Sequence, residues 1–154
     1  MLIRYSFIFF TAVNMFFAVG VAKANPDTSH YQQLHAMLFS GVRTTVLFTP
    51  GQCRLSPQAA NPTPIPPVSG GFAIRDFMEV PGDSISFSDE HFTVRPDGVA
   101  VLELVQYRVM HTDAATVTVR SLSPSNYQPM SPPRQFQCVV GDGLRFTSGM
   151  RVDH

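Results

Sequence analysis

The longest strand-like pattern in the sequence runs over residues 84–110 and is divided by one strong turn. β-Branched and aromatic residues are frequent in both halves, which predicts two antiparallel strands. The turn residues are Pro96, Asp97 and Gly98. Proline presets the φ angle of the first turn position, and glycine can take the positive φ that a three-residue hairpin loop requires. We therefore predict a β-hairpin that is closed by this loop.

The loop length sets which residues of the two strands face each other. It places His91 opposite Glu103 and Phe92 opposite Leu102. The second strand, residues 99–110, carries apolar residues at both odd and even positions, so both of its faces are apolar. This is typical of a central strand that is covered on both faces. Glu103 interrupts one of these apolar faces, so it needs a polar partner there.

The first strand changes the parity of its apolar residues halfway along. Ile85 and Phe87 point to one side of an unbroken strand, whereas Phe92 and Val94 point to the other. One extra residue within the segment 88–90 would bring all four side chains to the same face. We therefore expect a β-bulge in this segment, a feature that re-aims side chains and is frequent near functional sites.

The segment before the hairpin predicts one helix. Tyr31, Leu34 and Leu38 recur at helical spacing, residues 27–29 offer capping side chains, and Gly41 ends the pattern. Shorter strand patterns lie on both sides of the hairpin, at residues 42–48, 72–80, 115–122, 134–140 and 144–146.

Two proline-rich segments, 56–71 and 123–133, separate these strands and predict loops. The first is long for a compact domain, which indicates either disorder or a functional flap. Together the patterns predict a mainly β fold of the α+β class. In this fold one N-terminal helix packs on an antiparallel sheet of six or seven short strands, which is either open or curled towards a barrel.

The N-terminal pattern differs from the rest of the chain. Arg4 precedes an almost unbroken apolar run over residues 7–21, and Ala-Lys-Ala at 22–24 ends it. This arrangement is typical of a cleaved secretory signal peptide. A transmembrane helix is the alternative, but the run is slightly short for one and no second apolar span follows. We therefore predict a signal peptide over residues 1–24 and a single periplasmic or secreted domain over residues 25–154.

The charge of the exported part narrows the range of partners. The whole chain has 11 basic and 11 acidic residues. Removal of Arg4 and Lys23 with the signal peptide leaves nine basic residues, all of them arginine, and a net charge of −2. These charges are interspersed along the chain. We therefore expect neither a basic footprint for nucleic acid nor a polybasic patch for a membrane surface.

The chain contains two cysteines, Cys53 and Cys138, and both lie in the predicted exported part. An even pair in an oxidising compartment indicates a disulfide. A metal pair or a reactive thiol is the alternative, but neither cysteine has a CxxC motif or a nearby histidine. We therefore predict one disulfide between Cys53 and Cys138.

One polar cluster on the hairpin could carry chemistry. It consists of Ser88, Asp89, His91, Glu103 and Tyr107. A hydrolase would use Ser88 as the nucleophile beside His91, and a metal enzyme would use Asp89, His91 and Glu103 as ligands. The third interpretation is a structural cross-strand pair of His91 and Glu103 that fixes the bulge. We favour this pair because buried polar groups usually serve stability alone, and we assign no catalytic residue, cofactor or metal.

Six short motifs are spread over nearly the whole exported part. They are Leu-Phe-Ser-Gly at 38–41, Cys53 after the first strand, Gly-Gly-Phe-Ala-Ile at 70–74, Phe-Ser-Asp-x-His-Phe at 87–92, Tyr-Arg-Val at 107–109 and Phe-x-Cys at 136–138. Together they resemble the VirK family of small exported bacterial proteins. The family takes its name from a gene co-induced with virulence genes in plant-tumour-forming bacteria, and an unrelated enterobacterial group shares only the name. The resemblance implies export, an association with host contact and a shared Ser-Asp-x-His stretch, but no established biochemical activity.

These observations favour an exported, non-enzymatic domain that binds or protects something at the cell envelope or in host contact. Its partner would be an unidentified ligand or protein, and no membrane span is expected after cleavage of the signal peptide. The alternative is a secreted hydrolase or a metal-dependent enzyme centred on His91. A structural envelope protein without a ligand is the third hypothesis. The presence or absence of a concave pocket over His91 and Glu103 distinguishes best between them.

We expect the mature chain to begin at Asn25, because Ala22 and Ala24 provide the small residues of a signal-peptidase site. Intact-mass measurement of the protein that an expressing bacterium exports tests this prediction. The expected mass lacks residues 1–24. A protein that still carries them would favour a membrane anchor.

Overall fold

The computed structural model describes residues 28–56 and 67–149. Within these ranges the chain forms one α-helix, one short 3-10 helix and nine strands. In chain order they are α1 (His30–Phe39), β1 (Thr44–Phe48), the short 3-10 helix η1 (Pro50–Gln52), β2 (Arg54–Leu55), β3 (Gly70–Ala73), β4 (Phe77–Val80), β5 (Ser84–Val94), β6 (Ala100–Met110), β7 (Ala114–Leu122), β8 (Arg134–Val139) and β9 (Leu144–Ser148). No helix in the described part is long and apolar enough to cross a membrane. The predicted signal peptide lies outside the described residues.

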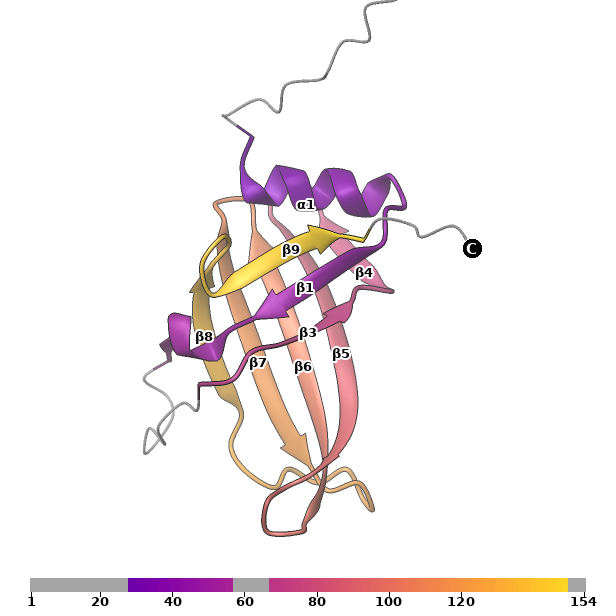
Figure 1. The fold of residues 1–154 in the computed structure, drawn as a ribbon, viewed down its shortest axis with the longest axis vertical. Coiled ribbons are helices and arrows are strands. Elements are labelled where there is room, and N and C mark those ends of the chain that lie inside the picture. Colours follow the sequence, from indigo (N-terminus) through magenta and orange to yellow (C-terminus); the bar gives the residue numbers. More distant parts are fainter. Residues whose placement is uncertain (1–27, 57–66, 150–154) are drawn as a thin grey trace, which may run out of the picture.

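The strands form two antiparallel sheets. The large sheet has six strands in the order β2-β8-β7-β6-β5-β4, and the small sheet has three in the order β3-β1-β9. Figure 1 shows the small sheet crossing the upper part of the large sheet, with α1 across the top. The lower parts of β5, β6 and β7 extend beyond the small sheet (Figure 1). The predicted mainly β fold with one helix is confirmed. Among the described strands, β2 and β4 are the edges of the large sheet, so it does not close into a barrel.

The N-terminus of α1 is held by local and by distant contacts. Ser29 and Gln32 form a capping box, in which each side chain accepts a hydrogen bond from the backbone N–H of the other residue. Asp113, in the turn between β6 and β7, has a positive φ of 64°. Its carboxylate accepts hydrogen bonds from the backbone N–H groups of His30 and Tyr31 at 3.2 and 2.7 Å. This contact fixes α1 to the end of the large sheet and places a negative charge at the helix N-terminus.

The apolar side of α1 faces the core, as its spacing predicts. Tyr31, Leu34 and Leu38 are buried, and Gly41 ends the helix with a positive φ of 73°. Tyr31 also donates a hydrogen bond from its hydroxyl to Glu79 on β4 at 3.2 Å. The helix prediction is therefore confirmed, including the residues that begin and end it.

The central hairpin has the predicted loop and register. The backbone N–H of Arg95 donates to the Val99 carbonyl at 2.9 Å, and Gly98 has a φ of 82°. β5 and β6 then pair without interruption along their whole length. β6 lies inside the large sheet, as predicted, but within the described ranges neither the helix nor the small sheet covers its outer face. Leu102 and Leu104 are only half-buried there, because the small sheet packs on one face of the large sheet.

The β-bulge predicted in the segment 88–90 is wrong. The continuous register leaves Ile85 and Phe87 buried on the inner face and turns Phe92 and Val94 outwards, where they are 63% and 58% exposed. The prediction assumed that all four apolar side chains serve one core. The inner face of the lower half of β5 instead carries polar side chains, and scattered apolar residues on an outer face are common in proteins.

The single strand predicted over residues 72–80 is also wrong. The segment divides into β3, which belongs to the small sheet, and β4, which belongs to the large sheet. Ile74 still donates its backbone N–H to the carbonyl of Thr44, the first residue of β1, at 2.8 Å, and the chain then crosses between the sheets. The crossing breaks the alternation, so Phe77 packs against the core while Met78 is 76% exposed.

The long loop predicted over residues 56–71 lies largely outside the described residues. Its last two residues, Gly70 and Gly71, already belong to β3. Gly71 approaches β1 so closely that a Cβ atom would overlap the Val46 carbonyl oxygen. Glycine therefore allows β3 to pair closely with β1 at this position.

Aromatic side chains from both sheets fill the core between them. Tyr107 on β6 stacks on Phe87 with ring centroids 5.0 Å apart, and Phe48 and Phe72 of the small sheet lie 6.0 and 5.6 Å from it. Phe48 also meets Phe136 on β8 edge-to-face at 5.5 Å. Each such pair contributes about 0.5–1.5 kcal/mol beyond the burial of its area. The cluster fixes where the small sheet lies on the large sheet.

The predicted disulfide between Cys53 and Cys138 is confirmed, with Cα atoms 4.6 Å apart. It joins the residue before β2 to β8, and β2 pairs with β8 directly after it. The bond therefore fixes the point where the chain passes from the small sheet to the edge of the large sheet. Gly143 lies against this bond, since a Cβ atom there would overlap the Cys53 Sγ.

We expect the double variant Cys53→Ala/Cys138→Ala to lose several kcal/mol of unfolding free energy. The bond closes a loop with a sequence separation of 85 residues, for which the chain-entropy model gives about 4.5 kcal/mol. Urea unfolding followed by circular dichroism measures the loss, and thiol labelling of the native wild-type protein should find no reactive thiol. Two reactive thiols, or an unchanged unfolding midpoint in the variant, would contradict this role.

Candidate functional site

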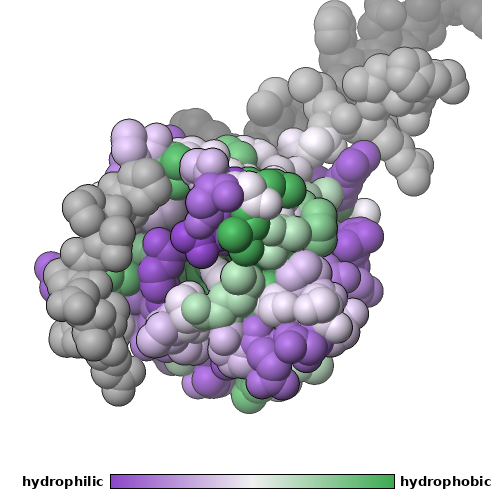
Figure 2. Space-filling view, turned by 90° about the horizontal axis from the view of Figure 1, so that it is seen from below, coloured by the Kyte–Doolittle hydropathy of each residue, from purple (hydrophilic) through white to green (hydrophobic). Residues whose placement is uncertain are grey.

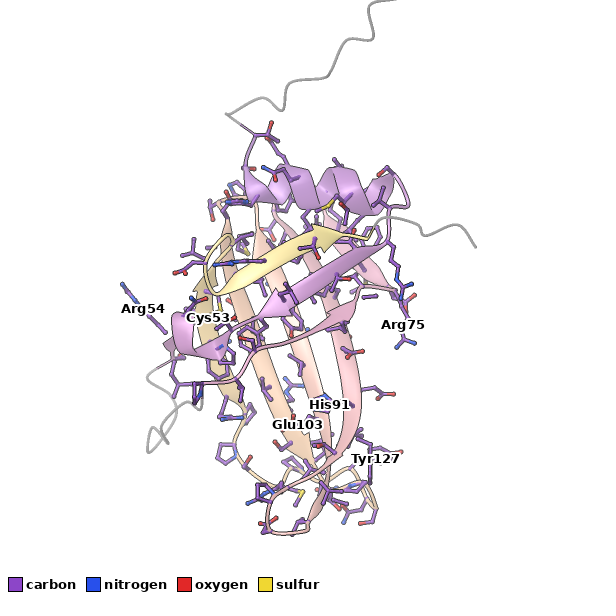
Figure 3. All side chains as sticks on the ribbon, in the orientation of Figure 1. Cys53, Arg54, Arg75, His91, Glu103 and Tyr127 are labelled. Carbon is purple, nitrogen blue, oxygen red and sulfur yellow. A yellow bond between two sulfur atoms is a disulfide. The ribbon has the colours of Figure 1, made fainter. Side chains whose placement is uncertain are left out.

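The inner face of the large sheet continues below the small sheet and forms a cavity of about 500 Å³. Figure 3 shows His91 and Glu103 close together on this lower part, beneath β3. In the view from below, hydrophobic surface reaches the middle of this end of the molecule, and hydrophilic side chains surround it (Figure 2). The polar hairpin cluster therefore lies in a concave region that is continuous with the core face.

The cavity lining combines an apolar floor with a few polar groups. Val105, Val119 and Phe136 form the floor on β6, β7 and β8. Residues 68–71, at the start of β3, form part of the rim. The polar side chains of the lining include those of Asp89, His91, Glu103, Tyr107 and Arg134. Ligand sites in proteins commonly have this composition, in which apolar side chains dominate and a few polar groups orient the ligand.

His91 and Glu103 form the cross-strand pair that the hairpin register predicts. Nε2 of His91 lies 3.1 Å from Oε2 of Glu103. The two side chains are 52% and 27% exposed. The pair is therefore partly solvated, and no bulge exists for it to fix. The sequence predicted a structural role because the pair would be buried and would fix a bulge, and the structure has neither feature.

Tyr107 supplies a buried ring and a protonated hydroxyl to the cavity. Its position on the inner face of β6, stacked on Phe87, leaves it only 4% exposed. Burial raises the pKa of Tyr107 above its ordinary value, and the negative charge of Asp89 raises it further. The hydroxyl therefore stays neutral at physiological pH and can donate a hydrogen bond to a group in the cavity.

Asp89 lies on the same face of β5 as His91, two residues nearer the core. Arg75 approaches its carboxylate at 3.9 Å, but the Arg75 side chain is 80% exposed. An ion pair at this distance and exposure contributes little. The Asp89 carboxylate is 24% exposed and therefore remains accessible to a cationic group in the cavity.

Ser88 does not belong to the site. Successive side chains of a strand point to opposite faces, so Ser88 is exposed on the outer face of β5 while His91 lies on the inner face. The predicted bulge would have been needed to change this parity. The hydrolase interpretation with Ser88 as a nucleophile beside His91 is therefore wrong.

The arrangement expected for a metal site is not found either. In the described ranges, no three His, Cys, Asp or Glu side chains converge closely enough to hold a metal ion. Asp89 and His91 are two residues apart on one strand, which separates their Cα atoms by about 7 Å. Among the residues that the structure describes, Glu103 pairs only with His91, so the three side chains do not form one ligand set.

Arg134 and the apolar floor of the cavity were missed from the sequence. Arg134 lies on β8 with its guanidinium carbon 6.0 Å from the centroid of the Phe136 ring. The alternation of side chains along each strand was the signal that could have identified these residues. Val119 follows the buried Val117, and Arg134 precedes the buried Phe136, at spacings of two residues. Each therefore continues the core face of its strand into the cavity.

Comparison with known families shows to which family this chain belongs. A family model described as VirK protein matches residues 27–127. The chain belongs to the VirK family. The match includes the whole hairpin, with Asp89, His91 and Glu103, and ends before β8. The resemblance that the sequence motifs carry is thus confirmed for this VirK family chain.

Two uncharacterized bacterial proteins and one solved VirK family structure are similar to this chain. The chain is 27% identical to the uncharacterized protein y4wH of Sinorhizobium fredii over 131 residues, which cover 85% of this chain and 88% of the relative. It is 24% identical to an uncharacterized protein from the pinF2 3′ region of Rhizobium radiobacter over 84 residues, which cover 54% of this chain and 58% of the relative. The crystal structure of a VirK family protein from Legionella pneumophila superposes with a TM-score of 0.67 at 19% identity, over 77% of this chain and 95% of that chain. At this identity the last similarity shows a shared fold.

We expect His91→Ala and Glu103→Gln each to change the free energy of unfolding by less than about 1 kcal/mol, because partly solvated ion pairs contribute little. Val109→Ala is the comparison: Val109 lies on the same face of β6 but is fully buried, so its truncation should cost more. Urea unfolding of the three variants measures these changes. A loss of several kcal/mol in either pair variant would instead support the structural interpretation of the pair.

Proposed function

We propose that this VirK family chain is an exported, non-enzymatic binding domain whose ligand occupies the cavity over Asp89, His91, Glu103 and Tyr107. It acts at the cell envelope or in contact with a host. One observation carries the proposal. The face that builds the core continues, without a break in register, into an open half that carries polar side chains and forms a cavity.

The composition of the cavity favours an apolar ligand that carries a cationic group. The floor of Val105, Val119 and Phe136 would bury apolar atoms, and Asp89 and Glu103 add two carboxylates on one side. The volume of about 500 Å³ falls within the range of about 300–1,000 Å³ that is usual for small-molecule sites. A cation placed near these carboxylates at partial burial would bind more strongly than at a fully exposed pair.

The arrangement of the side chains supports a binding role over the enzymatic alternative. Covalent catalysis needs a nucleophile and a base within hydrogen-bond reach of each other. Ser88 faces away from His91, and Tyr107 stays protonated because its pKa is raised. The partner of His91 is a carboxylate.

Two features support export. The N-terminal sequence has the pattern of a signal peptide. The Cys53–Cys138 disulfide is of a kind that persists in oxidising compartments and is rare in the cytosol. A domain of this size also gains much of its stability from such a bond, which fits an extracytoplasmic role.

We expect dansylcadaverine, a fluorescent aromatic compound with a terminal ammonium group, to bind the wild-type protein saturably. Its emission should shift to the blue as the dansyl ring enters the apolar cavity. Glu103→Gln removes one carboxylate charge at constant side-chain volume, and it should weaken binding about fivefold, or about 1 kcal/mol. A fluorescence titration measures both dissociation constants.

Val105→Phe and Leu104→Phe provide a matched control for this titration. They are adjacent on β6 and face opposite sides of the sheet. Val105→Phe fills the cavity and should abolish binding, whereas Leu104→Phe adds a ring to the outer face and should leave binding unchanged. Urea unfolding verifies that both variants fold. Absence of saturable binding to the wild type, or an equal effect of the two variants, would contradict the proposal.

A further inference from the structure

β3 has a free edge next to the cavity. Among the described strands, β3 pairs only with β1. The backbone N–H of Ile74 donates to the Thr44 carbonyl, and hydrogen-bonded pairs in an antiparallel ladder recur at every second residue. Gly70, Phe72 and Ile74 therefore direct their N–H and C=O groups at β1. Gly71 and Ala73, which alternate with them, direct theirs away from β1. They form the unpaired edge of the small sheet.

This edge lies directly above the open half of the large sheet. Gly70 and Gly71 line the cavity together with Val68 and Ser69. Figure 1 shows β3 as the lower border of the small sheet, with the lower parts of β5, β6 and β7 continuing beneath it. An unpaired strand edge is a template for a further strand. Here the next strand would lie over the cavity.

We propose that an extended peptide segment of another protein adds to β3 as the next strand of the small sheet and closes the cavity. This inference rests on the binding role proposed above and names the partner. Strand addition draws affinity from main-chain hydrogen bonds and specificity from alternate side chains. Gly71 and Ala73 offer the main-chain groups. Every second side chain of the peptide would point at the floor of Val105, Val119 and Phe136, because paired strands share the alternation of their side chains.

The path of β3 predicts the path of the added peptide. β3 crosses the large sheet from β8 towards β5. At its start Gly70 pairs with Phe48, which contacts Phe136 on β8. Two residues later Phe72 lies 6.1 Å from the ring of Phe87 on β5. A strand that pairs with β3 would cross β8, β7, β6 and β5 in the same way.

The charges along this path define the chemistry of the peptide. Its end over β8 would meet the exposed Arg134, and its other end would meet Asp89 on β5 and Glu103 on β6. Crossing four strands spans about three strand spacings of about 4.8 Å, so about five extended residues lie over the sheet and the residues that flank them carry the charges. The expected segment alternates apolar and polar residues, with an acidic residue facing the floor at one end and a lysine or arginine at the other.

Two synthetic peptides test this inference. One is acetyl-Glu-Thr-Val-Thr-Phe-Thr-Lys-amide, and the other has the glutamate and the lysine exchanged. Together they match the cavity charges for either direction of the added strand. We expect one of them to bind at least tenfold more tightly than the other in isothermal titration calorimetry. Equal affinities would show that the charges do not position the peptide, and would overturn the inference.

Ala73→Pro and Ala73→Ser separate main-chain pairing from side-chain contacts. Proline removes the outward N–H but leaves the ladder to β1 intact, since a sheet edge tolerates proline where the N–H faces solvent. Serine keeps the N–H and is the matched control. We expect Ala73→Pro to weaken binding of the better peptide at least tenfold and Ala73→Ser to change it less than twofold. Both variants should bind dansylcadaverine like the wild type.

Methylated peptides give the same test without a protein variant. One version carries N-methyl groups at the threonines and another at the valine and the phenylalanine. In a strand added to an edge, one of these two sets of N–H groups points at the edge. One methylation pattern should therefore abolish binding to the wild-type protein, and the other should be tolerated. Tolerance of both patterns would overturn strand addition.

The remaining outcomes distinguish this inference from the binding role itself. Binding of dansylcadaverine without binding of either peptide would overturn strand addition and leave the binding role standing. Binding of neither would overturn both proposals. Equal peptide binding by Ala73→Pro and Ala73→Ser would show that side chains alone hold the peptide. Dimers of the wild-type protein that the peptide dissociates would identify a second copy of this chain as the occupant, in place of another protein.

Discussion

The unbroken pairing of β5 with β6 is the constraint on which the core and the candidate site both depend. Side chains alternate strictly along two strands that pair without a bulge. Ile85 and Phe87 therefore share one face with Asp89 and His91. On β5 the upper half of this face is apolar and buried, and the lower half carries the half-buried Asp89 and the exposed His91. A bulge between the halves would have turned the polar residues to the outer face.

The small sheet decides how far the core extends along this face. It is held at the upper half by the aromatic cluster around Tyr107 and by the disulfide, which directs the chain from η1 to the edge of the large sheet. It ends at β3, although β5, β6 and β7 continue beyond it (Figure 1). The difference in length between the two sheets produces the cavity, and the same end of the small sheet exposes unpaired backbone groups. Both features follow from one structural cause.

The position of Tyr107 at the junction of the two halves connects stability with the proposed function. Its ring belongs to the core, where it stacks on Phe87, and it also forms part of the cavity lining. The His91–Glu103 pair lies beyond the core and is partly solvated. A ligand in the cavity would therefore contact a rigid floor that is set by core packing. Its polar contacts would come from side chains on which the fold depends little.

The sequence by itself determined the features that depend on a few neighbouring residues or on a covalent bond. The helix with its stop at Gly41, the loop ending at Gly98, the pairing of His91 with Glu103 and the disulfide were all predictable, because capping, turn geometry and cysteine pairing depend on few residues. Tertiary structure alone decided the division of residues 72–80 between two sheets, the open lower half and the free edge of β3. These depend on which strands pack on each other, and apolar alternation marks a buried face without showing what covers it. The same limit applied to the site: the sequence could place a polar pair on an apolar face, but only the packing of the two sheets showed that a cavity lies over it.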